Sequence, residues 1–161
     1  MASTVSIALK NSLPMTADNL LRGPARLVGV DVGTKRVGLA VSDPLKLFAQ
    51  PHGTYSPDEA LDELVRLADH DGIDAVVVGW PLTEDGGEDE ATEMVRAFVD
   101  RIEETLADPP IARSDERYTS ERAKELLRRA GVSQPGRYDK GRVDAAAAAV
   151  ILQDHLDATE T

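Results

Sequence analysis

The chain has 161 residues, which suits one ordinary domain with its own buried core. It has no cysteine, so disulfide bonds and thiolate metal sites are excluded, and this composition fits a reducing cytosol. No apolar run reaches the roughly 18 residues that a membrane span needs, and the formal net charge of −11 by itself disfavours a nucleic-acid partner.

The first segment, residues 1–25, is expected to be a flexible extension. It has neither the basic start nor the continuous apolar stretch of a signal peptide, and Met15 offers an alternative start. We expect the folded domain to span residues 26–157 and residues 158–161 to form a C-terminal tail.

Three strands are predicted next. Leu27–Gly33 and Val37–Ser42 are apolar runs joined by a short connection that opens with glycine, which is typical of a β-hairpin. A third, weaker strand is predicted over Phe48–Tyr55, where Pro51 favours a position at the edge of the sheet.

A helix then begins at Ser56-Pro57, a cap followed by a proline in the first turn, and ends at Gly72. Its predicted apolar face consists of Ala60, Leu61, Leu64, Val65 and Ala68. The continuous apolar run Ala75–Val78 predicts a central strand that is covered on both faces.

The rest of the chain alternates between helices and one strand. A helix follows the Gly86-Gly87 loop, and its apolar face is predicted to be Ala91, Met94, Val95, Phe98, Ile102 and Leu106. A short strand near Ile111–Glu116, a helix between Thr119 and Gly131, and a last helix from about Arg142 to His155 complete the order. The fold class is therefore α/β, with a mixed five-stranded sheet whose first three strands are antiparallel and which is flanked by helices.

Asp31 is the first candidate site residue, because it interrupts what should be the most buried strand. A charge in that position costs several kcal/mol unless it is paired or bound to a cation. The structural alternatives are an ion pair with Lys35 or Arg36, the two cations of the following turn, or a turn acid next to Gly33.

Asp115 and Glu116 lie at the end of the last strand, and strand ends in open α/β sheets are favoured ligand positions. Because side chains alternate along a strand, only one of the two should point toward Asp31. We favour Glu116; the alternative is a solvated strand end paired with Arg117.

Asp144 is predicted to lie at the start of the last helix, ahead of the alanine run 145–149, which allows a close approach to the sheet. Its structural alternative is an acid that complements the helix dipole, which stabilises a helix by roughly 0.3–1 kcal/mol. Together, the three acids Asp31, Glu116 and Asp144 suit a site for two Mg²⁺ or Mn²⁺ ions, because such ions prefer oxygen ligands and two of them can stabilise phosphodiester hydrolysis.

The charge is distributed unevenly along the chain. Residues 56–108 contain 17 acidic and 3 basic residues, whereas residues 113–142 contain 9 basic and 5 acidic ones. One part of the protein can therefore face phosphates in spite of the overall charge. The candidate phosphate-binding residues are Lys35, Arg36, Arg117, Arg137, Lys140 and Arg142.

The aromatic and histidine residues give weaker signals. Trp80 ends a strand and is able to stack on a base, but a packed core tryptophan is the favoured interpretation. His52, His70 and His155 have no metal-ligand spacing, so we expect none of them to be catalytic.

Four sequence blocks, in order, resemble the YqgF/RuvX family. They cover nearly all of residues 27–156, and small departures at Trp80 and Tyr118 leave the substrate preference open. The blocks are Val28–Asp43, Val78–Leu82 with Asp85-Gly86, Asp115–Ser120, and Lys140 with Asp144–Ala147.

The resemblance implies an RNase H-like fold whose site acids come from the first strand, a later strand and the last helix, which are Asp31, Glu116 and Asp144 here. It also implies processing of the 5′ end of pre-16S ribosomal RNA, Holliday junction resolution, or both. The partner would be a structured RNA precursor or branched DNA. Symmetric cuts in a junction would call for a homodimer, whereas RNA trimming would not.

Two alternatives come from other classes of function. The first motif also resembles the phosphate-binding hairpin of actin-like ATPases, but those proteins need two such domains and this chain is long enough for one. A non-catalytic RNA-binding or ribosome-assembly factor on the same fold is the main alternative, because fold does not imply function.

Overall fold

The computed structural model describes residues 25–83, 85–107, 109–115, 125, 128–129 and 140–159, and only the backbone of residues 140–142 and 159. Residues 1–24 of the expected extension and most of the helix predicted between Thr119 and Gly131 lie outside the described residues. In the described part, no helix is long and apolar enough to cross a membrane.

Five strands form one mixed sheet, as predicted. β2 pairs antiparallel with both β1 and β3, whereas β4 runs parallel to β1 and β5 parallel to β4. In spatial order the strands are β3 (Ala49–Tyr55), β2 (Val37–Ser42), β1 (Arg26–Val32), β4 (Ile73–Trp80) and β5 (Ile111–Asp115). The weak third strand is an edge strand, as the proline in it predicts.

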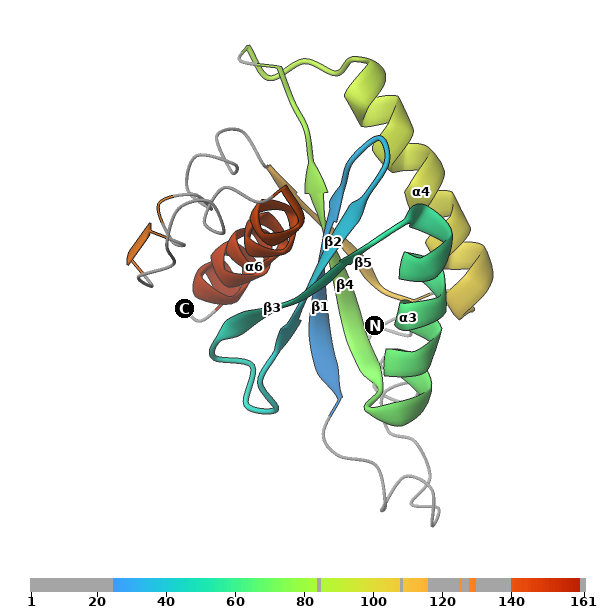
Figure 1. The fold of residues 1–161 in the computed structure, drawn as a ribbon, viewed down its shortest axis with the longest axis vertical. Coiled ribbons are helices and arrows are strands. Elements are labelled where there is room, and N and C mark those ends of the chain that lie inside the picture. Colours follow the sequence, from blue (N-terminus) through green and yellow to red (C-terminus); the bar gives the residue numbers. More distant parts are fainter. Residues whose placement is uncertain are drawn as a thin grey trace, which may run out of the picture.

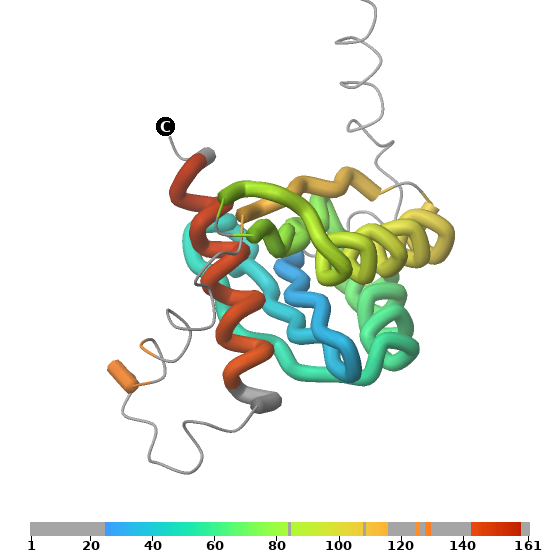
Figure 2. Tube along the Cα trace, turned by 90° about the horizontal axis from the view of Figure 1, so that it is seen from above, coloured from blue at the N-terminus to red at the C-terminus, as the bar shows by residue number. Residues whose placement is uncertain are grey.

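Helices cover both faces of the sheet. Helices α3 (Pro57–His70) and α4 (Glu90–Leu106) lie on one face, and α6 (Lys140–Thr159) lies on the other (Figure 1). The view from above in Figure 2 shows the same three layers. Helix α3 connects the edge strand β3 to β4, and its first turn is capped by the Ser56 hydroxyl, which accepts a hydrogen bond from the Glu59 N–H at 3.3 Å.

The two faces of β1 differ in side-chain size. Val28, Val30 and Val32 belong to the core shared with α3 and α4. On the α6 side, a Cβ atom on Gly29 would come within 2.6 Å of the Ala148 carbonyl oxygen. All five alanines of residues 145–149 are buried, so the alanine run does bring α6 close to the sheet.

Some details of the predicted helices were wrong. Leu67 is buried whereas Val65 and Ala68 are only partly so, because the core-facing stripe of α3 follows residues 60, 61, 64 and 67. In α4, the predicted residues Val95, Phe98 and Ile102 are buried, whereas Ala91, Met94 and Leu106 are only partly so, and Thr92 and Val99 are buried in addition. Helix α6 begins at Lys140, not near Arg142, so Asp144 lies in its second turn rather than at its start.

Candidate acidic site beside the β1–β2 turn

The β1–β2 connection is a tight turn at the carboxyl end of β1. The Gly33 N–H donates a hydrogen bond to the Arg36 carbonyl oxygen at 2.8 Å, and Thr34, Lys35 and Arg36 are exposed. This turn forms one wall of an open pocket of about 480 Å³. The residues that line the pocket are Gly33, Thr34, Lys35, Arg36 and Asp144.

Asp31 lies on the α6 side of the sheet. Side chains alternate along a strand, and Val30 and Val32 on either side of it face the α3–α4 core. Asp31 is half-buried and stands directly opposite Gly38 in the antiparallel pair of β1 and β2. The topology therefore directs the acid toward the face that α6 covers.

Gly38 brings Asp144 to the same place. A Cβ atom on Gly38 would come within 2.1 Å of the Asp144 carbonyl oxygen, so the backbone of α6 occupies the space of the missing side chain. Asp31 and Asp144 thus lie on either side of one glycine. Gly38 was not among the residues predicted for the site, although a glycine inside a strand is a known signal of close backbone approach.

The Asp144 carboxylate is half-buried and forms an ion pair with the turn. The Arg36 Nε donates to the Asp144 Oδ2 at 3.2 Å, and 43% of the Arg36 side chain is exposed. The helix-dipole explanation of Asp144 is weakened, because that effect falls off within the first turn of a helix and Asp144 lies in the second.

The ligand atoms that the site offers can be compared with those that a divalent cation prefers. Asp31 and Asp144 supply carboxylate oxygens, the ligand type that Mg²⁺ and Mn²⁺ prefer. Among the described residues, no group of three His, Asp or Glu side chains is close enough to hold a metal ion. The predicted third acid, Glu116, lies outside the described residues, so the described part of the site fits a cation in ligand type and supplies two of three predicted ligands.

Asp115 lies on the other side of the sheet. It is the register partner of Trp80, and Trp80 belongs to the core that faces α3 and α4. Asp115 is therefore not brought together with Asp31 and Asp144. Glu116 and Arg117 follow it directly in the sequence, outside the described residues.

Trp80 is packed in the core, as the favoured interpretation of the sequence predicts. It is 5% exposed, and its indole N–H donates to the Glu88 carboxylate at 3.1 Å. The Arg113 guanidinium lies 3.9 Å from the ring centroid and that of Arg96 lies 5.4 Å from it. Because its polar atom and its ring already have partners, Trp80 does not offer a free face for base stacking.

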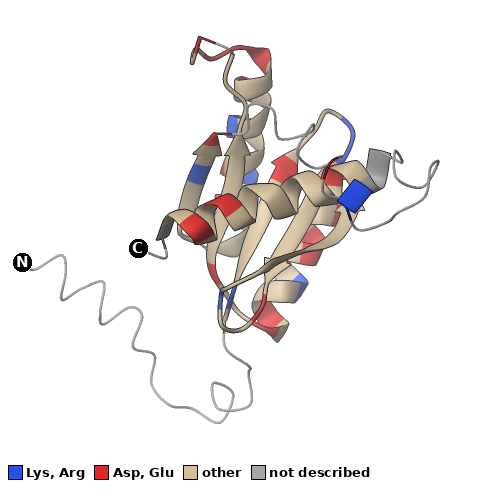
Figure 3. Ribbon diagram, turned by 90° about the vertical axis from the view of Figure 1, so that its left-hand side faces the viewer, with Lys and Arg blue, Asp and Glu red and all other residues tan. Residues whose placement is uncertain are grey.

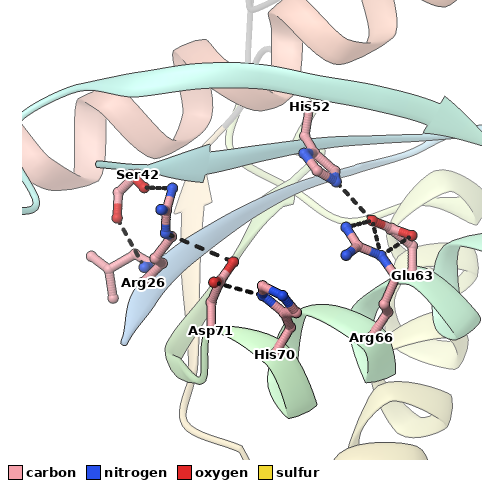
Figure 4. Close-up of polar contacts among 8 residues, drawn as sticks. Arg26, Ser42, His52, Glu63, Arg66, His70 and Asp71 are labelled. Atoms are coloured by element: carbon pink, nitrogen blue, oxygen red, sulfur yellow. Dashed lines mark hydrogen bonds and ion pairs between the residues drawn. The ribbon is translucent and has the colours of Figure 1, made fainter. Parts of the chain in front are cut away.

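Two histidines have structural partners on the α3 side of the sheet (Figure 4). His52 Nε2 lies 2.8 Å from the Glu63 carboxylate, and His70 Nδ1 lies 3.1 Å from that of Asp71. Hydrogen bonds from Arg66 and then His52 outweigh the effect of burial and lower the pKa of Glu63 to about 2. The His52–Glu63 contact ties α3 to β3, and both histidine contacts are separate from the Asp31–Asp144 region.

The structure describes the side chains of only some of the candidate phosphate-binding residues. Lys35 and Arg36 lie on the turn and line the pocket. In Figure 3 this basic turn lies near the N-terminal end of α6, whereas acidic residues lie toward the other end of the helix. Lys140 and Arg142 belong to the first turn of α6, but their side chains lie outside the described part of the structure, as do Arg117 and Arg137.

Comparison with protein families gives a match over residues 25–158 to the model described as "RuvX: Holliday junction resolvase". Two curated relatives are named "Putative pre-16S rRNA nuclease". The protein from Salinibacter ruber is 72% identical over 139 residues, which are 86% of this chain and 97% of the relative. That from Prosthecochloris aestuarii is 42% identical over 132 residues, which are 82% and 93% of the two chains.

Among solved structures, RuvC of T. thermophilus in complex with a Holliday junction substrate is similar in fold. The TM-score is 0.53 at 16% sequence identity, and the match covers 83% of this chain and 94% of RuvC. Identity at this level shows the fold alone, which is the RNase H-like fold that the sequence analysis predicted.

Proposed function

This chain belongs to the RuvX family, and from that premise we propose that it is a nuclease that hydrolyses phosphodiester bonds in structured nucleic acid. The observation that carries the proposal is that Asp31 and the backbone of Asp144 both neighbour Gly38, and that Asp144 lines a pocket together with Lys35 and Arg36. Two carboxylates next to two exposed cations at the end of a sheet suit a phosphate group that is to be cleaved.

The acids would hold the divalent cations on which we propose the reaction depends. Asp31, Glu116 and Asp144 would together hold two Mg²⁺ or Mn²⁺ ions through their carboxylate oxygens. Such ions polarise the attacked phosphate and the attacking water. Glu116 is chosen over Asp115 because Asp115 shares the face of Trp80, and alternation along a strand assigns the next residue to the opposite face.

The cations of the chain would bind and orient the substrate. Lys35 and Arg36 project from a turn whose backbone is fixed by the Gly33–Arg36 hydrogen bond, so they would hold the phosphate backbone in a constant position relative to Asp31. We propose the same role for Arg117, Lys140 and Arg142. An electrostatic contact of this kind binds any sequence and weakens with salt.

The substrate we favour is the precursor of 16S ribosomal RNA, because the relatives named above carry that activity in their names. The description of the family supports a second candidate, the Holliday junction. Resolution of a junction by paired cuts would require a two-fold dimer. For either substrate the compartment we propose is the cytoplasm, which is consistent with a chain that lacks cysteine.

The test is cleavage of a labelled pre-16S 5′ leader RNA and a synthetic four-way DNA junction, side by side. Each is incubated with Mg²⁺ or Mn²⁺, with EDTA, and with the Asp31→Asn variant. We expect cleavage of one substrate that requires the cation and is reduced about 100-fold or more in the variant. Binding without cleavage by the wild-type protein would instead support the non-catalytic RNA-binding factor.

A further inference from the structure

We propose that Arg36 controls the access of divalent cations to Asp144, an inference that rests on the proposed function. The guanidinium of Arg36 contacts the Oδ2 atom of Asp144 at 3.2 Å. That oxygen is one of the two through which Asp144 is able to bind a cation. A positively charged group and a metal ion repel each other at such a distance, so they compete for it.

The structure holds the two partners in place from both sides. Asp144 is fixed by the contact of its backbone with Gly38, and the backbone of Arg36 is fixed by the hydrogen bond from Gly33. The Arg36 side chain is nearly half exposed and lines the open pocket. Release of Asp144 from Arg36 therefore requires only rotation of the Arg36 side chain, without a change in the fold.

After its release, the Arg36 guanidinium would be able to bind a phosphate in the same pocket. An arginine binds a phosphate through two parallel hydrogen bonds, and the pocket is where we place the substrate phosphate. Arg36 would thus exchange one anionic partner for another: Asp144 before the cation binds, and the phosphate afterwards. In this arrangement Arg36 is a positioning residue that tunes cation affinity.

Lys35 provides a matched control. It lies on the same turn and lines the same pocket, and it carries the same charge. Among the described residues, the ion pair with Asp144 is made by Arg36 and not by Lys35. Removal of either charge changes the long-range potential at the site to a similar extent, but of the two changes only removal of Arg36 also removes an ion pair from the Asp144 carboxylate.

The experiment is calorimetric titration of Mn²⁺ into the wild-type protein and the Arg36→Gln, Lys35→Gln, Asp144→Asn and Asp144→Asn/Arg36→Gln variants, without nucleic acid. We expect Arg36→Gln to bind Mn²⁺ about two- to fivefold more tightly than Lys35→Gln does, the range set by a partly exposed ion pair. The Arg36→Gln change should have no such effect once Asp144 is Asn. Arg36→Met is a second variant in case Arg36→Gln does not fold.

The outcomes separate the two proposals. Equal affinities of the Arg36 and Lys35 variants, with wild-type binding that still depends on Asp144, would overturn the role of Arg36 and leave the proposed function intact. Wild-type protein that binds no Mn²⁺ through Asp144 would overturn both the proposed metal site and the inference that rests on it.

Discussion

Asp31 and Gly38 are directly opposite each other in the antiparallel pair of β1 and β2, and the space above Gly38 is filled by the backbone of Asp144. One glycine therefore sets the separation between the first strand and the last helix at the point where each carries an acid. Any side chain at this position would push α6 away from the sheet.

The Gly38→Ala variant tests this relationship. Its Cβ atom would come within 2.1 Å of the Asp144 carbonyl oxygen, so we expect the free energy of unfolding to fall by about 1–3 kcal/mol, the usual cost of overpacking. We also expect cleavage to fall by more than the loss of folded protein explains. Chemical denaturation and cleavage assays would measure the two effects.

Gly29→Ala is the control for that variant. Its Cβ atom would meet the Ala148 carbonyl oxygen at 2.6 Å, one turn further along α6 and away from Asp31. It should destabilise the protein by a similar mechanism with a smaller effect on cleavage. Equal losses of cleavage in the two variants would show that general packing of α6, and not the position of Asp144, determines activity.

The register of β4 and β5 leads to a prediction about the two neighbouring acids at the end of the last strand. Asp115 shares the face of Trp80 and not that of Asp31. We expect Asp115→Asn to keep cleavage within about tenfold of wild type and Glu116→Gln to lose about 100-fold or more. Cleavage rates under single-turnover conditions would decide it, and the reverse order would mean that Asp115 is the ligand.

Glu63 should contribute to the acid sensitivity of the fold. Its folded-state pKa of about 2 lies below the ordinary value of 4.5, chiefly because Arg66 donates hydrogen bonds to it. A depressed carboxylate pKa stabilises the folded state above pH 4.5, and this stabilisation is lost as the pH falls toward 2. In Glu63→Gln, the unfolding free energy should depend less steeply on pH in that range.

The matched control for that experiment is Asp62→Asn, which removes an exposed acid from the same helix without touching the Glu63–Arg66 pair. Urea denaturation at a series of pH values would be measured for both variants. If the two variants and the wild-type protein had parallel pH profiles, the contribution assigned to Glu63 would be wrong.

Trp80 is the only tryptophan of the chain, so its fluorescence reports on one site. Because the ring is 5% exposed and lies against Arg113, we expect saturating nucleic acid to leave its emission nearly unchanged. Trp80→Ala should lower the free energy of unfolding by about 3–5 kcal/mol. Strong quenching by single-stranded RNA would instead support base stacking.

Much of the architecture could be predicted from the sequence, because it is written in local patterns. The glycine-opened turn after Leu27–Gly33 predicted the hairpin, Pro51 predicted an edge strand, and the run Ala75–Val78 predicted a central one; the sheet confirms each. Asp31 could also be recognised from a local pattern, because it interrupts an apolar strand and the burial of an unpaired charge is costly. The boundaries and inner faces of the helices were less accurate, because they depend on which neighbouring element covers each turn.

What the sequence by itself determined, then, is the order and type of the elements in the described part of the chain, the family, and a set of candidate acids. Only the tertiary structure decided that Asp115 faces away from Asp31, that Gly38 receives the backbone of Asp144, and that Arg36 pairs with Asp144. Arg36 and Asp144 are 108 positions apart, and local periodicity carries no information over such a separation. Their contact depends on the strand register and on how closely the alanine face of α6 packs on the sheet, which are properties of the assembled core and not of any one segment.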